Sequence, residues 1–171
     1  KGQYTIDYLT VKPGGTLHAV SHVFYDDLES TKVATLYNKD LNIRAGGYIT
    51  TNWMNFNGDY VVIDKFGHIS ADDGGYVLGT GPSPGLQSVS NVYATGAAHG
   101  GRGGLAYGRI DSPLAYGSMY LPHQFGSGGG LGTNRDLHGG GRGGGVLRFN
   151  VSSVLRVEGS IHANGGAPIV T

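Results

Sequence analysis

The sequence predicts an all-β fold, a right-handed parallel β-helix (a β-solenoid) that carries a long glycine-rich loop, with a β-sandwich as the alternative. Three observations predict it. A short apolar pattern occurs four times, glycine supplies 33 of the 171 residues, and no window shows helical periodicity. Glutamate occurs only at Glu29 and Glu158, so good helix formers are scarce while turn and strand formers dominate.

The repeat consists of an apolar residue, any residue, Val or Ile, a spacer, Gly, any residue, and Ile or Leu. Each copy predicts two short strands joined at a glycine corner, where close backbone approach or a positive φ excludes larger residues. Successive corner glycines are 32, 20 and 92 residues apart, and 20 residues make about one turn of a parallel β-helix. The four copies are Leu9-Val11-Gly15-Leu17, Leu41-Ile43-Gly47-Ile49, Val61-Ile63-Gly67-Ile69 and Leu155-Val157-Gly159-Ile161.

The similarity of the copies, and the lack of two-residue Asn-Gly hairpin turns, favour the β-solenoid over the β-sandwich. The first spacing leaves room for a loop at residues 20–33, and the last contains a glycine-rich tract at residues 96–145. Aromatic and apolar residues interrupt this tract, so we expect an ordered loop region packed on the solenoid rather than a flexible linker.

We expect one β-solenoid domain over residues 1–171. The chain starts at Lys1 instead of Met, and residues 167–171 resemble a strand cut short. Both features predict a piece of a longer or assembled structure with open strand edges at its ends.

Residues 139–166, GGGRGGGVLRFNVSSVLRVEGSIHANGG, resemble a motif of large glycine-rich extracellular β-solenoid proteins of the adhesin or structural type. The segments HGGRGG and YGSMYLPHQFGSGGG are similar to the loops that precede this motif in such proteins. The resemblance covers residues 95–166, with weaker echoes at 6–19, 40–52 and 60–75. It implies an extracellular or cell-surface location and an adhesive or structural role, and it brings no catalytic residues.

Composition excludes several function classes. The absence of cysteine excludes disulfide scaffolds, Cys-based zinc sites and thiol catalysis. Twelve basic and twelve acidic residues, with no basic stripe, argue against nucleic-acid binding. No apolar run is long enough to insert into a membrane. The glycine runs lack the Lys-Ser/Thr of a phosphate-binding loop, and we expect no cofactor.

We first expect the His and Arg side chains of the glycine-rich region to satisfy carbonyls of the bare glycine backbone, and its aromatics to belong to the core. The alternative is a ligand site for a glycan or an anion, formed by polar and aromatic side chains of this region. The candidates are His99, Arg102, Asp136, His138, Arg142, Tyr116 and Tyr120.

Metal and modification sites have weaker signals. Asp72 and Asp73 precede two glycines, which predicts turn chemistry first and a calcium site second. His18 and His22 have a zinc-like spacing that matters only on a helix, so we expect no metal there. Asn150 begins the only N-glycosylation sequon and is predicted to face outward from a strand.

These observations predict an extracellular structural or assembly module, a subunit of a fibre, surface coat or adhesin that self-associates through open β edges. A carbohydrate-binding module is the alternative, and the glycans are then the partner. A polysaccharide lyase or hydrolase is the lesser alternative, and would need paired carboxylates. The pairs available are Asp26 with Asp27, Asp59 with Asp64, Asp72 with Asp73, and Asp111 with Asp136.

Overall fold

The computed structural model describes residues 3–5, 7–19, 34–37, 39–87, 94–105, 111–118, 120–132 and 139–168. The predicted loop at residues 20–33 and the last three residues of the chain lie outside this range. The described residues form β-strands and no helix, so no helix among them could span a membrane. The chain divides into two compact units, Lys1–Ala71 with Leu147–His162 (unit 1) and Asp72–Val146 with Ala163–Thr171 (unit 2).

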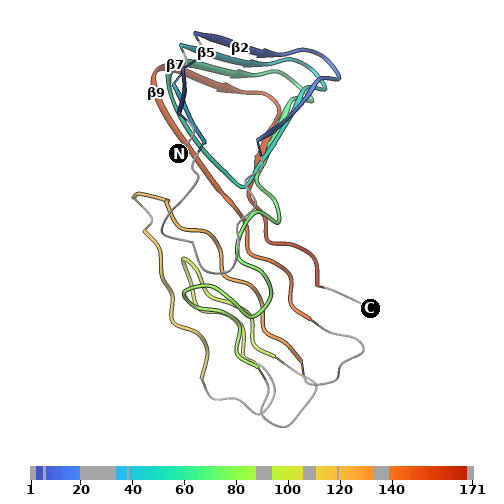
Figure 1. The fold of residues 1–171 in the computed structure, drawn as a ribbon, viewed down its shortest axis with the longest axis vertical. Helices are drawn as coiled ribbons and strands as arrows, with labels where there is room; N and C mark the ends of the chain where they lie inside the picture. Colours follow the sequence, from blue (N-terminus) through green and yellow to red (C-terminus); the bar gives the residue numbers. More distant parts are fainter. Residues whose placement is uncertain are drawn as a thin grey trace. The chain divides into compact units, whose positions relative to one another are not determined.

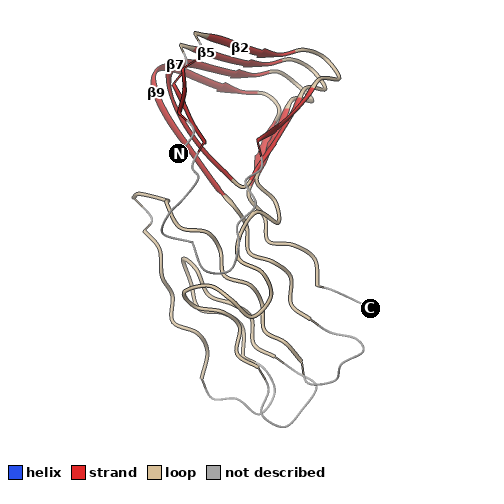
Figure 2. Ribbon diagram, in the orientation of Figure 1, coloured by secondary structure: helices blue, strands red, loops and turns tan. Residues whose placement is uncertain are grey.

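Unit 1 is built from parallel strands in two sheets (Figures 1 and 2). Seven strand pairs of unit 1 have a parallel register, which confirms the predicted all-β, parallel-strand character. The first sheet contains β1 (Gln3–Thr5), β4 (Ala34–Tyr37), β7 (Trp53–Ile63), β5 (Asp40–Ile43) and β2 (Tyr8–Val11), and β9 (Val146–Val157) pairs with β7. The second sheet contains β10 (Ser160–His162), β8 (His68–Ser70), β6 (Tyr48–Thr51) and β3 (Thr16–Ala19).

The chain runs through both sheets in four successive passes, β1–β3, β4–β6, β7–β8 and β9–β10. In Figure 1, β2, β5, β7 and β9 lie side by side along one edge of unit 1. The registers align three copies of the repeat in the first sheet and all four copies in the second sheet. In the first sheet Leu9 pairs with Leu41 and Leu41 with Val61, and in the second sheet Leu17, Ile49, Ile69 and Ile161 form one column.

The repeat glycines occupy the corner between the two sheets. Here the backbone N–H of Tyr48 donates to Gly15, that of His68 to Gly47 and that of Ser160 to Gly67, at 2.9, 2.9 and 3.0 Å. A Cβ atom on Gly159 would overlap the carbonyl oxygen of Gly67. Close approach of neighbouring passes therefore requires glycine at position 159. At Gly15, Gly47 and Gly67 a Cβ atom would lie nearest to a carbonyl oxygen of its own turn, at 3.0, 2.9 and 3.0 Å.

The positive φ of this corner belongs to the residue before the repeat glycine. Gly14 and Gly46 adopt φ of 72° and 74°, and in the third pass Phe66 adopts 66°. Glycine takes this conformation without the steric penalty that a Cβ atom brings. The side chain of Phe66 is exposed at this turn, where the Lys65 ammonium lies 5.2 Å from its ring.

The core of unit 1 lies inside the second and third passes. Its largest fully buried side chains come from the inward positions of the repeat and from the first half of β7. Leu147, Phe149 and Val151 of β9 pack against them, with the alternation that the sequence predicts. The largest fully buried apolar side chains are those of Phe56, Leu41, Ile43, Ile49, Ile63, Ile69 and Val61.

Unit 2 consists of extended glycine-rich segments joined by backbone hydrogen bonds (Figure 2). The bonds recur every third residue. The N–H groups of Gly126 and Gly129 donate to Gly144 and Gly141, both at 2.9 Å, and the carbonyls of Gly126 and Gly129 accept from Tyr76 and Gly79. An extended polyproline II helix has three residues per turn and no internal hydrogen bonds, so every third residue faces the same neighbour.

The spacing of the segments in unit 2 requires glycine. A Cβ atom on Gly143 would overlap the carbonyl of Gly126, and one on Gly140 would lie 2.6 Å from the Cα of Gly129. The contact pairs 126–143 and 129–140 are again three residues apart on both segments. Glycine is therefore used here to bring backbones together, as at the crowded axis of collagen.

Candidate functional site

The structure brings two of the predicted ligand-site residues together in unit 2. The rings of His99 and Tyr116 meet edge to face, with centroids 4.8 Å apart. The Tyr116 hydroxyl donates to the carbonyl of Phe125 at 2.6 Å and accepts from the Ser127 hydroxyl at 2.8 Å. Burial raises the pKa of the Tyr116 hydroxyl above its ordinary value, against the opposing effect of the Ser127 hydrogen bond.

The other residues of that prediction have different surroundings. Arg142 donates to the carbonyl of Gly75 at 3.4 Å, which is the backbone-satisfying role that the sequence favours. Arg102 is exposed, and Tyr120 is 88% exposed. Asp136 and His138 lie outside the described residues.

The predicted Asp72-Asp73 turn is present. Asp72 accepts a hydrogen bond from the backbone N–H of Asn164 at 2.6 Å, and Asp73 adopts a positive φ of 59°. Within the described ranges, no group of three or more His, Cys, Asp or Glu side chains could hold a metal ion. Asp72 therefore acts as a turn residue whose carboxylate accepts a hydrogen bond from the backbone.

Of the remaining predicted residues, Asp111 lies in unit 2, and the others lie in unit 1 or outside the described range. Asn150 is exposed in β9, where its side-chain amide donates to Asn57 at 3.3 Å. Asp59 accepts a hydrogen bond from the Ser152 hydroxyl. His18 lies in β3, and Asp111 is exposed. His22, Asp26 and Asp27 fall outside the described residues.

The two ends of the strand stack in unit 1 differ from its middle, and they form the candidate functional site. Among the described strands, β1, β2, β3 and β10 are terminal in their sheets, and β9 joins the first sheet through β7. Several inward repeat positions that are buried in the middle passes are exposed at the ends, although Val11 of the first pass is only 6% exposed. Ile49 is 1% exposed but Leu17 of the first pass is 37% exposed; Leu41 is 0% exposed but Leu155 of the fourth pass is 51% exposed.

Charge also changes along the stack. The residue that follows each first-sheet strand donates its N–H to the pass before it: Arg44 to Val11, Asp64 to Ile43 and Glu158 to Ile63, at 3.0, 2.9 and 2.8 Å. The column formed in this way has a basic half at the first-pass end and an acidic half at the fourth-pass end. It contains Lys12, Arg44, Asp64 and Glu158.

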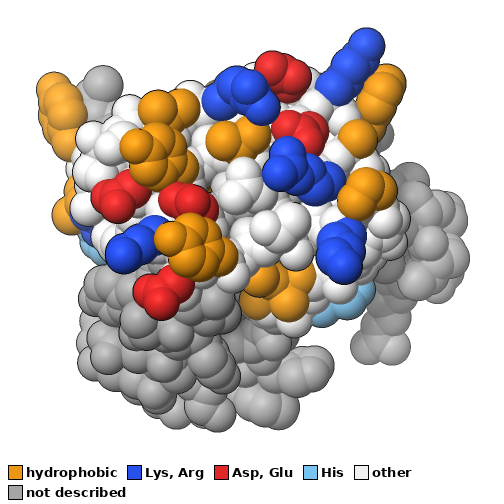
Figure 3. Space-filling model, turned by 90° about the horizontal axis from the view of Figure 1, so that it is seen from above, with side chains coloured by type: hydrophobic (Ala, Val, Ile, Leu, Met, Phe, Trp, Pro, Cys, Tyr) orange, Lys and Arg blue, Asp and Glu red, His pale blue; other side chains and the backbone are white. Residues whose placement is uncertain are grey.

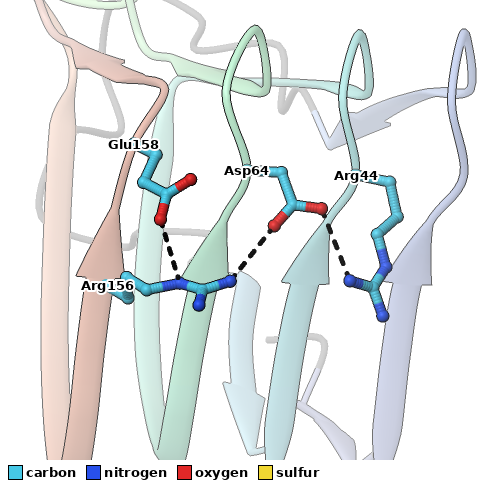
Figure 4. Close-up of polar contacts among 4 residues, drawn as sticks. All are labelled: Arg44, Asp64, Arg156 and Glu158. Carbon is cyan, nitrogen blue, oxygen red and sulfur yellow. Dashed lines mark hydrogen bonds and ion pairs between the residues drawn. The ribbon is translucent and has the colours of Figure 1, made fainter.

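The middle of this column is an ion-pair network (Figure 4). Asp64 lies between Arg44 of the second pass and Arg156 of the fourth, at 3.4 Å from each, and Arg156 also contacts Glu158 at 3.7 Å. Basic, acidic and hydrophobic side chains are mixed on the face of unit 1 seen in Figure 3. Because these side chains are largely exposed, each pair contributes only about 0–1 kcal/mol to stability.

Sequence reasoning missed the charge column, although its signal was present. Each member of the column directly follows the Val or Ile of its repeat. Comparing the residue after that Val or Ile in the four copies would have revealed the column.

No family model, no curated protein and no solved structure matches this chain. The proposed function therefore rests on the geometry of the described residues.

Proposed function

We propose that unit 1 is a right-handed parallel β-helix that serves as an extracellular structural or assembly module, and that it associates through its open ends. The observation that carries this proposal is the exposure of apolar side chains at both ends of the stack. Leu155 and Val157 are 51% and 42% exposed, whereas the equivalent Val61 and Ile63 are fully buried. The hand is the one that crossovers between parallel strands adopt almost without exception.

Association at these ends is favoured by two physical effects. An edge strand presents unpaired N–H and C=O groups, which form a template for another strand. Burial of the exposed apolar side chains adds about 25 cal/mol for each Å² removed from water. If two different ends meet and the rotation does not close, the product is a filament.

Three further features support this proposal over the alternatives. The parallel registers fit a β-helix better than an immunoglobulin-type sandwich, whose sheets are antiparallel. The resemblance of residues 139–166 to glycine-rich extracellular β-solenoid proteins fits a fibre, coat or adhesin subunit. A formal net charge of zero leaves little long-range repulsion between copies.

The test is a dilution series followed by analytical ultracentrifugation and negative-stain electron microscopy. We expect filaments above a critical concentration and a fibre-diffraction reflection at about 4.8 Å along the axis, the spacing of paired strands. A monomer at every concentration would refute the assembly function.

A carbohydrate-binding module is the second candidate, and the aromatic side chains of unit 2 favour it. Tyr120 is 88% exposed, and the edge-to-face pair of His99 and Tyr116 lies in the same glycine-rich unit. Exposed tyrosine rings can stack on sugar rings. A glycan array probed with the protein and with Tyr120→Ala tests this candidate, which is rejected if no glycan distinguishes the two.

A further inference from the structure

We propose that the partner at the open ends is a second copy of this chain, bound head to tail, with Glu158 of one copy against Lys12 of the next. This inference rests on the proposed assembly function and specifies its partner, polarity and register. The fourth pass of one copy would be followed by the first pass of the next copy, as each pass follows another within the chain.

The backbone of the molecule supplies the register. Within the chain, the N–H groups of Asp64 and His68 donate to Ile43 and Gly47 of the preceding pass. In the first pass, Lys12 occupies the position of Asp64 and Thr16 the position of His68. Across the junction, their N–H groups would therefore donate to the carbonyls of Val157 and Gly159.

This register also continues the apolar columns of the core. It places Leu155 against Leu9, Val157 against Val11, and Ile161 against Leu17 of the next copy. These are the positions that Leu41, Ile43 and Ile49 fill inside the stack, where exposure is 1% or less. The side chains left exposed at the ends, Leu17, Leu155 and Val157, would be covered by residues of their own kind.

Charge complementarity selects head-to-tail polarity. In each copy the column runs from two basic residues, Lys12 and Arg44, to two acidic residues, Asp64 and Glu158. In a head-to-tail stack the acidic end of one copy would therefore meet the basic end of the next. The pair formed by Glu158 and the next Lys12 would reproduce the pair of Arg44 and Asp64, which contact at 3.4 Å across one pass boundary. Both Lys12 and Glu158 are exposed, and Glu158 also contacts Arg156 of its own strand at 3.7 Å.

Head-to-head contact is the competing geometry, and Glu158 distinguishes the two. Two first passes in contact would run antiparallel, which brings Lys12 toward the start of the opposite β2 strand, near Asp7. That arrangement depends on Lys12 but leaves Glu158 outside the interface. Dependence of assembly on both residues is therefore specific to the head-to-tail arrangement.

Charge reversal tests the proposal. We expect Lys12→Glu and Glu158→Lys each to raise the critical concentration for assembly about tenfold at low salt, because an attractive pair becomes a repulsive one. An equimolar mixture of the two variants should co-assemble near the wild-type concentration, since each supplies the opposite charge at the junction. Lys65→Glu makes the same charge change in the exposed turn of the third pass and should have little effect.

The outcomes separate the two proposals. Co-assembly of the mixture also proves that both variants are folded. If Lys12→Glu blocks assembly and Glu158→Lys does not, the contact is head to head and the present inference is wrong. If wild type assembles and neither variant differs from it, the register is wrong while the assembly function stands. A monomeric wild type overturns the assembly function itself, and this inference with it.

Discussion

Leu41 and Leu155 are the same residue at the same position of the repeat, yet one is fully buried and the other is 51% exposed. The difference comes only from where each pass lies in the stack. The β7 pass covers Leu41 on one side and the first pass covers it on the other. This pair therefore offers a matched test of the stack at the scale of single residues.

We expect Leu41→Ala to lower the free energy of unfolding by about 2–5 kcal/mol, because it leaves a cavity in the core. Leu155→Ala should cost less than about 1 kcal/mol in dilute protein, since most of that side chain already contacts water. Urea unfolding followed by circular dichroism measures both values. Equal losses would show that Leu155 is buried in the monomer and would weaken the open-end proposal.

At the scale of elements, unit 2 shows how glycine forms a structure without regular strands. The segments around Gly126, Gly129 and Gly143 are joined by backbone bonds at three-residue intervals and approach too closely for side chains. The sequence predicts order in this tract from its interspersed aromatics and apolar residues. The pairing of particular glycines depends on segments far apart in the chain, so local pattern does not contain it.

Gly143→Ala tests this close packing. We expect it to lower stability by about 1–3 kcal/mol, because its methyl group would overlap the Gly126 carbonyl and force the segments apart. Gly100→Ala is the matched control: it lies in the same tract, and a Cβ atom there would meet nothing within 4 Å. The control should be neutral or stabilising by up to about 1 kcal/mol. Differential scanning calorimetry compares them, and equal melting temperatures would contradict the packing described.

At the scale of the whole molecule, charge balance bears on association. Twelve basic and twelve acidic side chains give a formal charge of zero with histidine neutral. Copies of a protein without net charge do not repel one another over long distances, so local charge pairs decide how salt affects their association.

We therefore expect added salt to weaken assembly at pH 7, because it screens the proposed pair of Lys12 with Glu158 at the junction. At about 0.5 M salt the Debye length falls to a few Å, and the critical concentration should rise. Static light scattering at fixed protein concentration measures this. Assembly that is equally strong at low and high salt would show that charge pairs do not control it.

The sequence by itself determined the repeat and the glycine corner of unit 1. Both are local patterns, in which alternation sets the inward face and glycine marks the tight corner between strands. It also predicted the outward position that the exposed Asn150 occupies and the turn at Asp72-Asp73. Its candidate ligand site was only partly assembled in the described residues, as the contact of His99 with Tyr116.

Only the tertiary structure decided which copies of the repeat are ends and which are core. Four similar repeats cannot encode their own order of stacking, because that order depends on how the chain returns after intervening segments of very different length. The same reason explains the ion pair of Asp64 with Arg156, which are 92 residues apart. Exposure and charge at the ends of the stack, the basis of the proposed function, follow from that order.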